Sequence, residues 1–168
     1  MRSDFTDMIL LTTTGEILWK TSNGSLKKDK FAANTGIELL EVSPGYAKAR
    51  MEIEEKHRNA LRAVQGGALF TLADLAFAAA SNAHGTAAVG INANISFVKA
   101  ALNGTLTAEA NETSINPKIA TYTVNIIDDE GDLVATFQGM VYRKKSFHLI
   151  FLRLKPQKLK FCRKQRSK

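Results

Sequence analysis

The stretch Gly66-Gly67-Ala68-Leu69-Phe70-Thr71-Leu72-Ala73-Asp74-Leu75-Ala76-Phe77-Ala78-Ala79-Ala80 decides the fold of this chain. After the glycine pair, nearly all of its residues are strong helix formers. Apolar side chains fall on every face of the helix that they predict, which is typical of a helix buried all round. A helix of about 15 residues is too short to cross a bilayer. The sequence therefore predicts a helix buried inside the protein.

A single charge, the carboxylate of Asp74, interrupts this apolar stretch. A lone buried carboxylate is costly, so it must shift its pKa, find hydrogen-bond donors or take part in a reaction. The alternative is that Asp74 lies on a narrow strip of the helix that faces solvent. The stretch alone leaves both interpretations open.

The size and composition of the chain indicate one globular domain. A length of 168 residues suits a single domain with its own core, and 45% apolar and 23% charged residues are ordinary values. The single cysteine, Cys162, excludes a disulfide within the chain and fits a reducing compartment. We therefore expect a cytoplasmic protein, and no segment reaches the length of a transmembrane helix.

The positive charge belongs to the C-terminal tail. Residues 143–168 contain 11 of the 23 Lys and Arg residues and no acid, whereas residues 1–142 carry a net charge of −4. The basic composition is thus no evidence that the folded part binds nucleic acid. We expect an irregular lead-in over residues 1–26, a domain over residues 27–143 and a basic tail over residues 144–168. Contact of the tail with nucleic acid or an anionic membrane stays open as an alternative function.

Alternating and β-branched segments on both sides of the helix predict strands. The expected strands are 37–42, 46–54, 87–98, 105–113, 119–127 and 133–142. A short polar helix is expected over residues 27–34, with Phe31 as its anchor. Short turns predict that strands consecutive in the chain are antiparallel neighbours. The expected fold class is α+β, an antiparallel sheet of about six strands curved around one long central helix.

The glycine pair at the helix start predicts a site for an acceptor atom. Backbone N–H groups and the helix dipole converge there and would polarise a carbonyl oxygen, as an oxyanion hole does. Asp74 lies about 12 Å further along the same helix, too far to act on the same carbon. If Gly66 and Asp74 serve one substrate, Asp74 must come from a second copy across a two-fold interface. A turn that merely permits tight helix–sheet packing is the alternative.

A longer pattern, Asn59 followed by Gln65-Gly66-Gly67-Ala68 and then Asp74, resembles the signature of a known family. It is similar to that of hotdog-fold acyl-CoA thioesterases of the phenylacetic-acid-degradation type. Further matches are Asn94-Ile95-Ser96-Phe97, Asp132-Leu133-Val134-Ala135 and Gly139-Met140-Val141-Tyr142-Arg143. The resemblance covers about residues 28–143. It implies a hotdog fold, hydrolysis of an acyl- or aryl-acyl-CoA, a homodimer or homotetramer, and no metal or cofactor beyond the coenzyme A of the substrate.

The resemblance also implies roles for individual residues. The Gly66 N–H would polarise the thioester carbonyl, and Asp74 of a partner subunit would act as nucleophile or as general base toward water. Asn59 would hold the water or the thioester. Gln65 stands where the family has a histidine. Glutamine can donate a hydrogen bond but cannot shuttle a proton.

Three further residues are expected to contact the substrate. Gly67 is expected to contact the substrate, and Lys99 and Arg143 to contact coenzyme A phosphates, with plain surface charge as the alternative. The glutamine in place of histidine leaves open a non-catalytic protein that binds acyl-CoA as a sensor or scavenger, although the presence of Asp74 argues against it.

Two histidines and an acidic turn are expected to have no part in the site. His57 and His84 lack a metal-binding pattern and are expected to be solvated loop residues. The acidic residues of 128–132 lack the spacing of a calcium loop and are expected to form a solvated hairpin turn.

Overall fold

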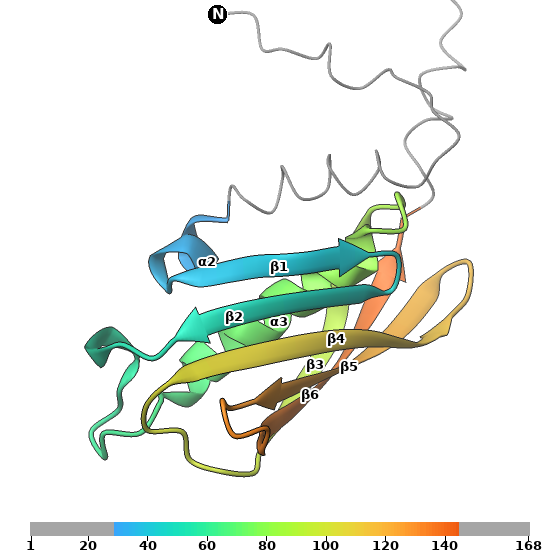
Figure 1. The fold of residues 1–168 in the computed structure, drawn as a ribbon. Coiled ribbons are helices and arrows are strands. Elements are labelled where there is room, and N and C mark those ends of the chain that lie inside the picture. The colour runs from blue at the N-terminus through green and yellow to red at the C-terminus, as the bar shows by residue number, and fades with distance from the viewer. Residues whose placement is uncertain (1–28, 145–168) are drawn as a thin grey trace, which may run out of the picture.

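The computed structural model describes residues 29–144 (Figure 1). Within this range an antiparallel sheet curves around the long helix α3, so the predicted α+β architecture is confirmed. The lead-in over residues 1–26 and the basic tail beyond Lys144 lie outside the described residues. The strands are β1 (Ile37–Ser43), β2 (Tyr46–Glu52), β3 (Ala88–Phe97), β4 (Thr105–Ile115), β5 (Ile119–Ile127) and β6 (Leu133–Arg143). In the part of the chain that the structure describes, no helix is long and apolar enough to cross a membrane.

The position of strand β3 differs from the prediction. The sheet order is β1-β2-β4-β5-β6-β3, so β3 is an edge strand paired with β6 and does not neighbour β4. Residues 98–104 carry the chain from β3 past β6 and β5 to β4. Seven residues can span roughly 24 Å, whereas three strand spacings need about 14 Å, so the connection is long enough to cross. The expectation of sequential neighbours is wrong at this connection and correct for the hairpins β1–β2, β4–β5 and β5–β6.

Helix α3 (Gly66–Asn82) packs most of its surface against the sheet. Its buried residues are Leu69, Leu72, Ala73, Leu75, Ala76, Phe77, Ala79, Ala80 and Ser81. Gly67, Thr71, Asp74 and Ala78 form a strip that keeps solvent access in the single chain. We call these four residues the open strip. The prediction of burial on every face is therefore wrong for one chain by itself.

The ring of Phe77 explains how closely the helix approaches the sheet. A Cβ on Gly139 of β6 would lie 2.7 Å from Phe77 Cζ, and one on Gly90 of β3 would lie 3.5 Å from Phe77 Cε1. The ring also packs against Tyr122 and Phe137, with centroids 5.5 Å apart in both pairs. The absence of a side chain at Gly139 makes the room that this aromatic cluster needs.

The short helix α2 (Lys30–Asn34) begins with Asp29 as its N-cap. The carboxylate accepts the N–H groups of Phe31 and Ala32, at 2.9 and 3.1 Å. Ala32 is buried in the core, whereas Phe31 is 71% exposed, so the prediction of Phe31 as the anchor is wrong. Successive side chains of an α-helix point about 100° apart. In this short helix Ala32 faces the core, so the adjacent Phe31 points away from it.

Candidate active site

The first amide groups of helix α3 differ in their partners. The side-chain oxygen of Gln65 accepts the Gly67 N–H, and the backbone oxygen of Gln65 accepts the Ala68 N–H at 2.9 Å. The Gly66 N–H has no hydrogen-bond partner among residues 29–144. Helix N-termini carry partial positive charge. A donor for an incoming acceptor atom is thus present at Gly66, while the Gly67 N–H is occupied.

An aromatic ring lies directly beside this donor. A Cβ on Gly66 would lie 2.9 Å from Phe97 Cζ and 3.3 and 3.4 Å from the two Cε atoms. The tip of the Phe97 ring therefore lies against Gly66 Cα. Sequence reasoning singled out Phe97 only as part of the matching Asn94–Phe97 segment and missed this contact, since it joins the end of β3 to the start of α3.

Asn59 organises the loop that leads into the helix. Its side-chain oxygen accepts the N–H groups of Leu61 and Ala63 at 2.9 and 3.2 Å, and its own N–H donates to the Ala63 oxygen at 2.8 Å. Its side-chain NH₂ makes no hydrogen bond within the described residues. The loop thus fixes one end of the amide and leaves the donor end available. Asn59 and Gly66 lie at the same end of α3.

Asp74 lies on the open strip, eight residues after Gly66 on the same helix. Helical rise separates the two by about 12 Å, so one chain does not bring them together. Burial of the carboxylate among neighbouring atoms raises the pKa of Asp74, and the negative charge of Asp29 raises it further. A raised pKa makes the ionised carboxylate a stronger base.

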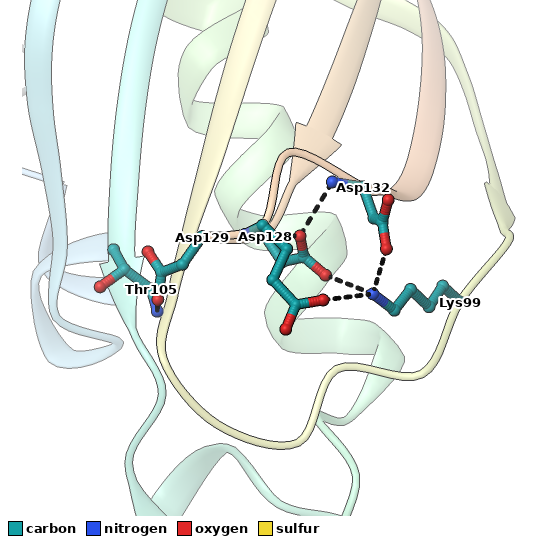
Figure 2. Close-up of polar contacts among 6 residues, drawn as sticks. Lys99, Thr105, Asp128, Asp129 and Asp132 are labelled. Atoms are coloured by element: carbon teal, nitrogen blue, oxygen red, sulfur yellow. Dashed lines mark hydrogen bonds and ion pairs between the residues drawn. The ribbon is translucent and has the colours of Figure 1, made fainter.

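Lys99 has protein partners of its own. Its amine lies 2.8 Å from Asp128 Oδ2, 2.7 Å from Asp132 Oδ2 and 3.7 Å from Glu130 Oε2. Figure 2 shows the amine between Asp128 and Asp132. Hydrogen bonds to the two aspartates raise the pKa of Lys99 above its usual value. The amine therefore holds the crossing connection 98–104 against the β5–β6 turn. This contact competes with the phosphate contact expected for Lys99.

The acidic turn has more structure than the sequence predicted. Asp128 Oδ1 accepts the N–H groups of Glu130 and Asp132, and Asp129 Oδ2 accepts the Thr105 N–H at 2.7 Å (Figure 2). Carboxylate oxygens of Asp128, Glu130 and Asp132 lie within 4.8 Å of one another, and the Lys99 amine already lies among them. The expected solvated hairpin turn is found, with residues 129–132 exposed, and the turn in addition ties three segments together.

Arg143 lies at the other end of the sheet. It pairs with Ala88 at the start of β3 and donates to the Asn116 backbone oxygen at 2.9 Å. Phe97, the residue beside Gly66, is at the opposite end of β3. The structure therefore does not bring Arg143 to Gly66 within one chain.

Both histidines differ from the prediction of solvated loop residues. His57 is only 3% exposed, with Nδ1 accepting the Glu54 N–H at 2.9 Å and Nε2 donating to the Thr35 oxygen at 2.8 Å. His84 Nε2 lies 2.6 Å from Glu112 Oε2, which also accepts the Tyr122 hydroxyl at 2.8 Å. Burial and the Glu112 carboxylate together raise the pKa of Tyr122. Both predictions are wrong because one partner of each histidine, Thr35 for His57 and Glu112 for His84, lies 22 and 28 residues away in the sequence.

Comparison with protein families and known proteins identifies relatives of this chain. The family model of the thioesterase superfamily matches residues 63–135. The acyl-coenzyme A thioesterase PaaI of Escherichia coli is 32% identical over 126 residues, which are 74% of this chain and 90% of that protein. A protein of Archaeoglobus fulgidus to which esterase activity is ascribed is 42% identical over 118 residues, 70% of this chain and 77% of that protein.

Solved structures of similar sequence share the fold. The E. coli PaaI structure superposes with a TM-score of 0.73 at 31% identity, covering 77% of this chain and 94% of that chain. A Thermus thermophilus protein gives a TM-score of 0.66 at 34% identity, covering 70% of this chain and 99% of that chain. The predicted family and fold are thereby confirmed. The chain belongs to the hotdog-fold acyl-CoA thioesterases of the PaaI type and is a thioester hydrolase.

Proposed function

We propose that this protein hydrolyses an acyl- or aryl-acyl-CoA to the free acid and coenzyme A, in sites shared between two subunits of a cytoplasmic homo-oligomer. The observation that carries the proposal is the Gly66 N–H at the start of α3, which has no hydrogen-bond partner within the described residues 29–144. A thioester carbonyl oxygen accepting this N–H gains stabilisation as negative charge develops on it. The other part of the reaction, activation of water, needs a base that reaches the same carbonyl carbon.

The exposed edge of the sheet supports a second subunit. Within residues 29–144 strand β3 pairs on one side only, and Val89 and Ile91 are 47% and 54% exposed. An uncovered apolar edge strand is prone to pair with another chain. The open strip of α3 is a second uncovered surface in the same chain. A two-fold axis across the β3 edge would pair two copies of β3 antiparallel and set their α3 helices antiparallel as well.

This two-fold arrangement brings the middle of one α3 helix toward the start of the other. Asp74 of the partner subunit then serves as nucleophile or general base for a carbonyl bound at Gly66. Asn59 presents its side-chain NH₂ to the water or thioester, and Gln65 holds the helix start in place. Gly67 contacts the substrate through its exposed Cα. Arg143 of the partner subunit is the proposed contact for coenzyme A phosphates, in a dimer or tetramer, whereas the Lys99 amine is held by Asp128 and Asp132.

A subunit-complementation experiment tests the shared site. Asp74→Asn removes the base, and Gly66→Pro removes the N–H. Proline is tolerated at the first helical position, and Gln65 has the extended backbone (φ −68°, ψ 135°) that precedes proline. Each variant alone should release no thiol from acyl-CoA. Gly66→Ala, which keeps the N–H, is the control for the added bulk.

Mixed dimers give the decisive result. Random refolding of the two inactive variants makes half of the dimers mixed, and each mixed dimer has one intact site of two, so roughly a quarter of the wild-type activity should return. If each site were contained within one chain, mixing would restore no activity, because every chain carries one of the two substitutions. Full turnover by Asp74→Asn alone would reject the catalytic role of that residue.

A further inference from the structure

We propose that Phe97 is a specificity-determining residue, the aromatic wall against which the acyl group of the substrate lies. The inference rests on the proposed function of the Gly66 N–H and names the part of the substrate that each side of the site receives. The Phe97 ring is 56% exposed in the chain, so it is available for contact. Three observations support the assignment.

The first observation is the contact between Phe97 and Gly66. The ring tip lies so close that a methyl group on Gly66 would come within 2.9 Å of Cζ. A carbonyl oxygen that accepts the Gly66 N–H lies about 2.9 Å from that nitrogen, and its carbon lies one bond further. A group attached to this carbonyl carbon is therefore within reach of the ring.

The second observation is that Phe97 belongs to an apolar surface. Alternation along β3 sets Phe97 and Ile95 on the same face, and Ile95 is paired with Phe137 of β6. Phe137 packs edge-on against Phe70, with centroids 5.3 Å apart, and Phe70 lies one helical turn from Gly66. Phe70 and Ile95 are only partly buried. Apolar side chains with free surface thus extend from Gly66 beneath the first turns of α3.

The third observation is the polarity of the loop of residues 58–65, which leads into α3. This loop carries the Asn59 amide and the Arg62 side chain. Arg62 has a left-handed backbone (φ +65°), and its guanidinium makes no hydrogen bond or ion pair within the described residues. By contrast, Arg58 is fully engaged with Glu55, with Asn103 and with backbone oxygens. An unoccupied cation and a free amide suit the amide-rich, phosphate-bearing coenzyme A arm.

Together these surfaces orient the thioester. The coenzyme A arm extends along the polar loop, and the acyl group lies against Phe97. Ligand sites commonly combine an apolar wall with a few polar groups in this way. An aromatic wall favours a flat or bulky acyl group over a short one. The expected preference is for aryl-acyl-CoA over acetyl-CoA.

The test compares two substrates that share the same carbonyl and the same coenzyme A. In Phe97→Ala, kcat/KM for phenylacetyl-CoA should fall about tenfold relative to kcat/KM for acetyl-CoA. Inhibition by free coenzyme A should stay at the wild-type level. Val98→Ala is the matched control, because Val98 is the adjacent apolar residue, is 61% exposed and, unlike Phe97, supplies none of the atoms nearest to a Cβ on Gly66. It should leave the ratio unchanged.

Two further variants keep the proposal testable if Phe97→Ala folds poorly. Phe97→Leu retains apolar volume and should lower the same ratio by a smaller factor. Gly66→Ala must displace the Phe97 ring and should change the ratio while keeping the N–H. An equal loss on both substrates, or the same change in Val98→Ala, contradicts the role of Phe97. A wild-type protein that releases no thiol from any acyl-CoA contradicts the proposed function instead.

Discussion

The side-chain oxygen of Gln65 accepts the N–H of Gly67, while the N–H of Gly66 between them has no partner within the described residues. Glutamine therefore fills the N-cap position of α3 and holds the glycine pair in register. This gives Gln65 a structural task that does not require a proton-carrying ring. The family's histidine position is occupied here by a residue that stabilises the helix start.

The first prediction concerns this cap. Gln65→Ala should lower the free energy of unfolding by about 1 kcal/mol, the usual cost of losing an N-cap side chain. Denaturant unfolding followed by circular dichroism measures the change. Gln138→Ala, at an exposed position of β6, is the control and should change the stability little. Equal stability of the two variants would show that the cap contributes nothing.

The second prediction concerns the pH dependence that Asp29 imposes on Asp74. Burial and the Asp29 charge raise the pKa of Asp74, so the ionised base is lost at a higher pH than for an ordinary aspartate. Asp29→Asn removes the charge and keeps an N-cap oxygen for α2. The acid limb of the kcat/KM–pH profile should therefore move to lower pH.

The same shift has an effect on stability. A raised folded-state pKa means that the native protein binds more protons than the unfolded chain between the ordinary and the raised pKa, so stability falls as pH rises through that window. Asp74→Asn should remove this fall, as thermal unfolding across the acid range would measure. A fall of unchanged size in Asp74→Asn would assign it to other groups.

The third prediction concerns the packing of Phe77. Gly139→Ala should destabilise the protein by about 1–3 kcal/mol, because the new methyl overlaps the Phe77 ring in a filled core. Gly90→Ala is the matched control, since its methyl would meet the same ring at an ordinary contact distance of 3.5 Å. Urea unfolding of both variants gives the comparison. Similar losses in both would point to strand propensity in place of overlap.

The fourth prediction separates the two roles of Lys99. Lys99→Met removes the amine from between Asp128 and Asp132, so the melting temperature should fall, and the fall should shrink at high salt, where charges are screened. KM for acyl-CoA should stay the same, because the amine already contacts two carboxylates. Lys118→Met, whose side chain has no partner in residues 29–144, should not change the melting temperature. A raised KM with unchanged stability would assign Lys99 to the substrate.

The hairpins and the central helix could be predicted from local patterns. Alternation in β2 and β5 identified the buried faces, and Tyr122, Val124 and Ile126 are buried as expected. The place of β3 could not be predicted in this way. Alternation reveals which side chains share a face, but it does not reveal the strand that pairs with them, and a connection of seven residues suits either a turn or a crossing.

The candidate site, like the fold, could be predicted only in part. The spacing of Asn59, Gly66 and Asp74 is local and could be read from the sequence. The contact of Phe97 with Gly66 and the carboxylate partners of Lys99 depend on tertiary structure. No local signal distinguished the buried His57 from a surface histidine, because its partner Thr35 lies 22 residues away in the sequence.

The edge position of β3 also has a consequence for synthesis of the chain. Strand β3 leaves the ribosome before β4, yet its partner within the chain, β6, begins roughly 36 residues later. At ordinary translation rates this interval lasts about 2 to 7 seconds. During that time an apolar strand has neither of its eventual neighbours available. The nascent chain therefore passes through a stage in which chaperone binding at residues 88–97 would protect it from premature association.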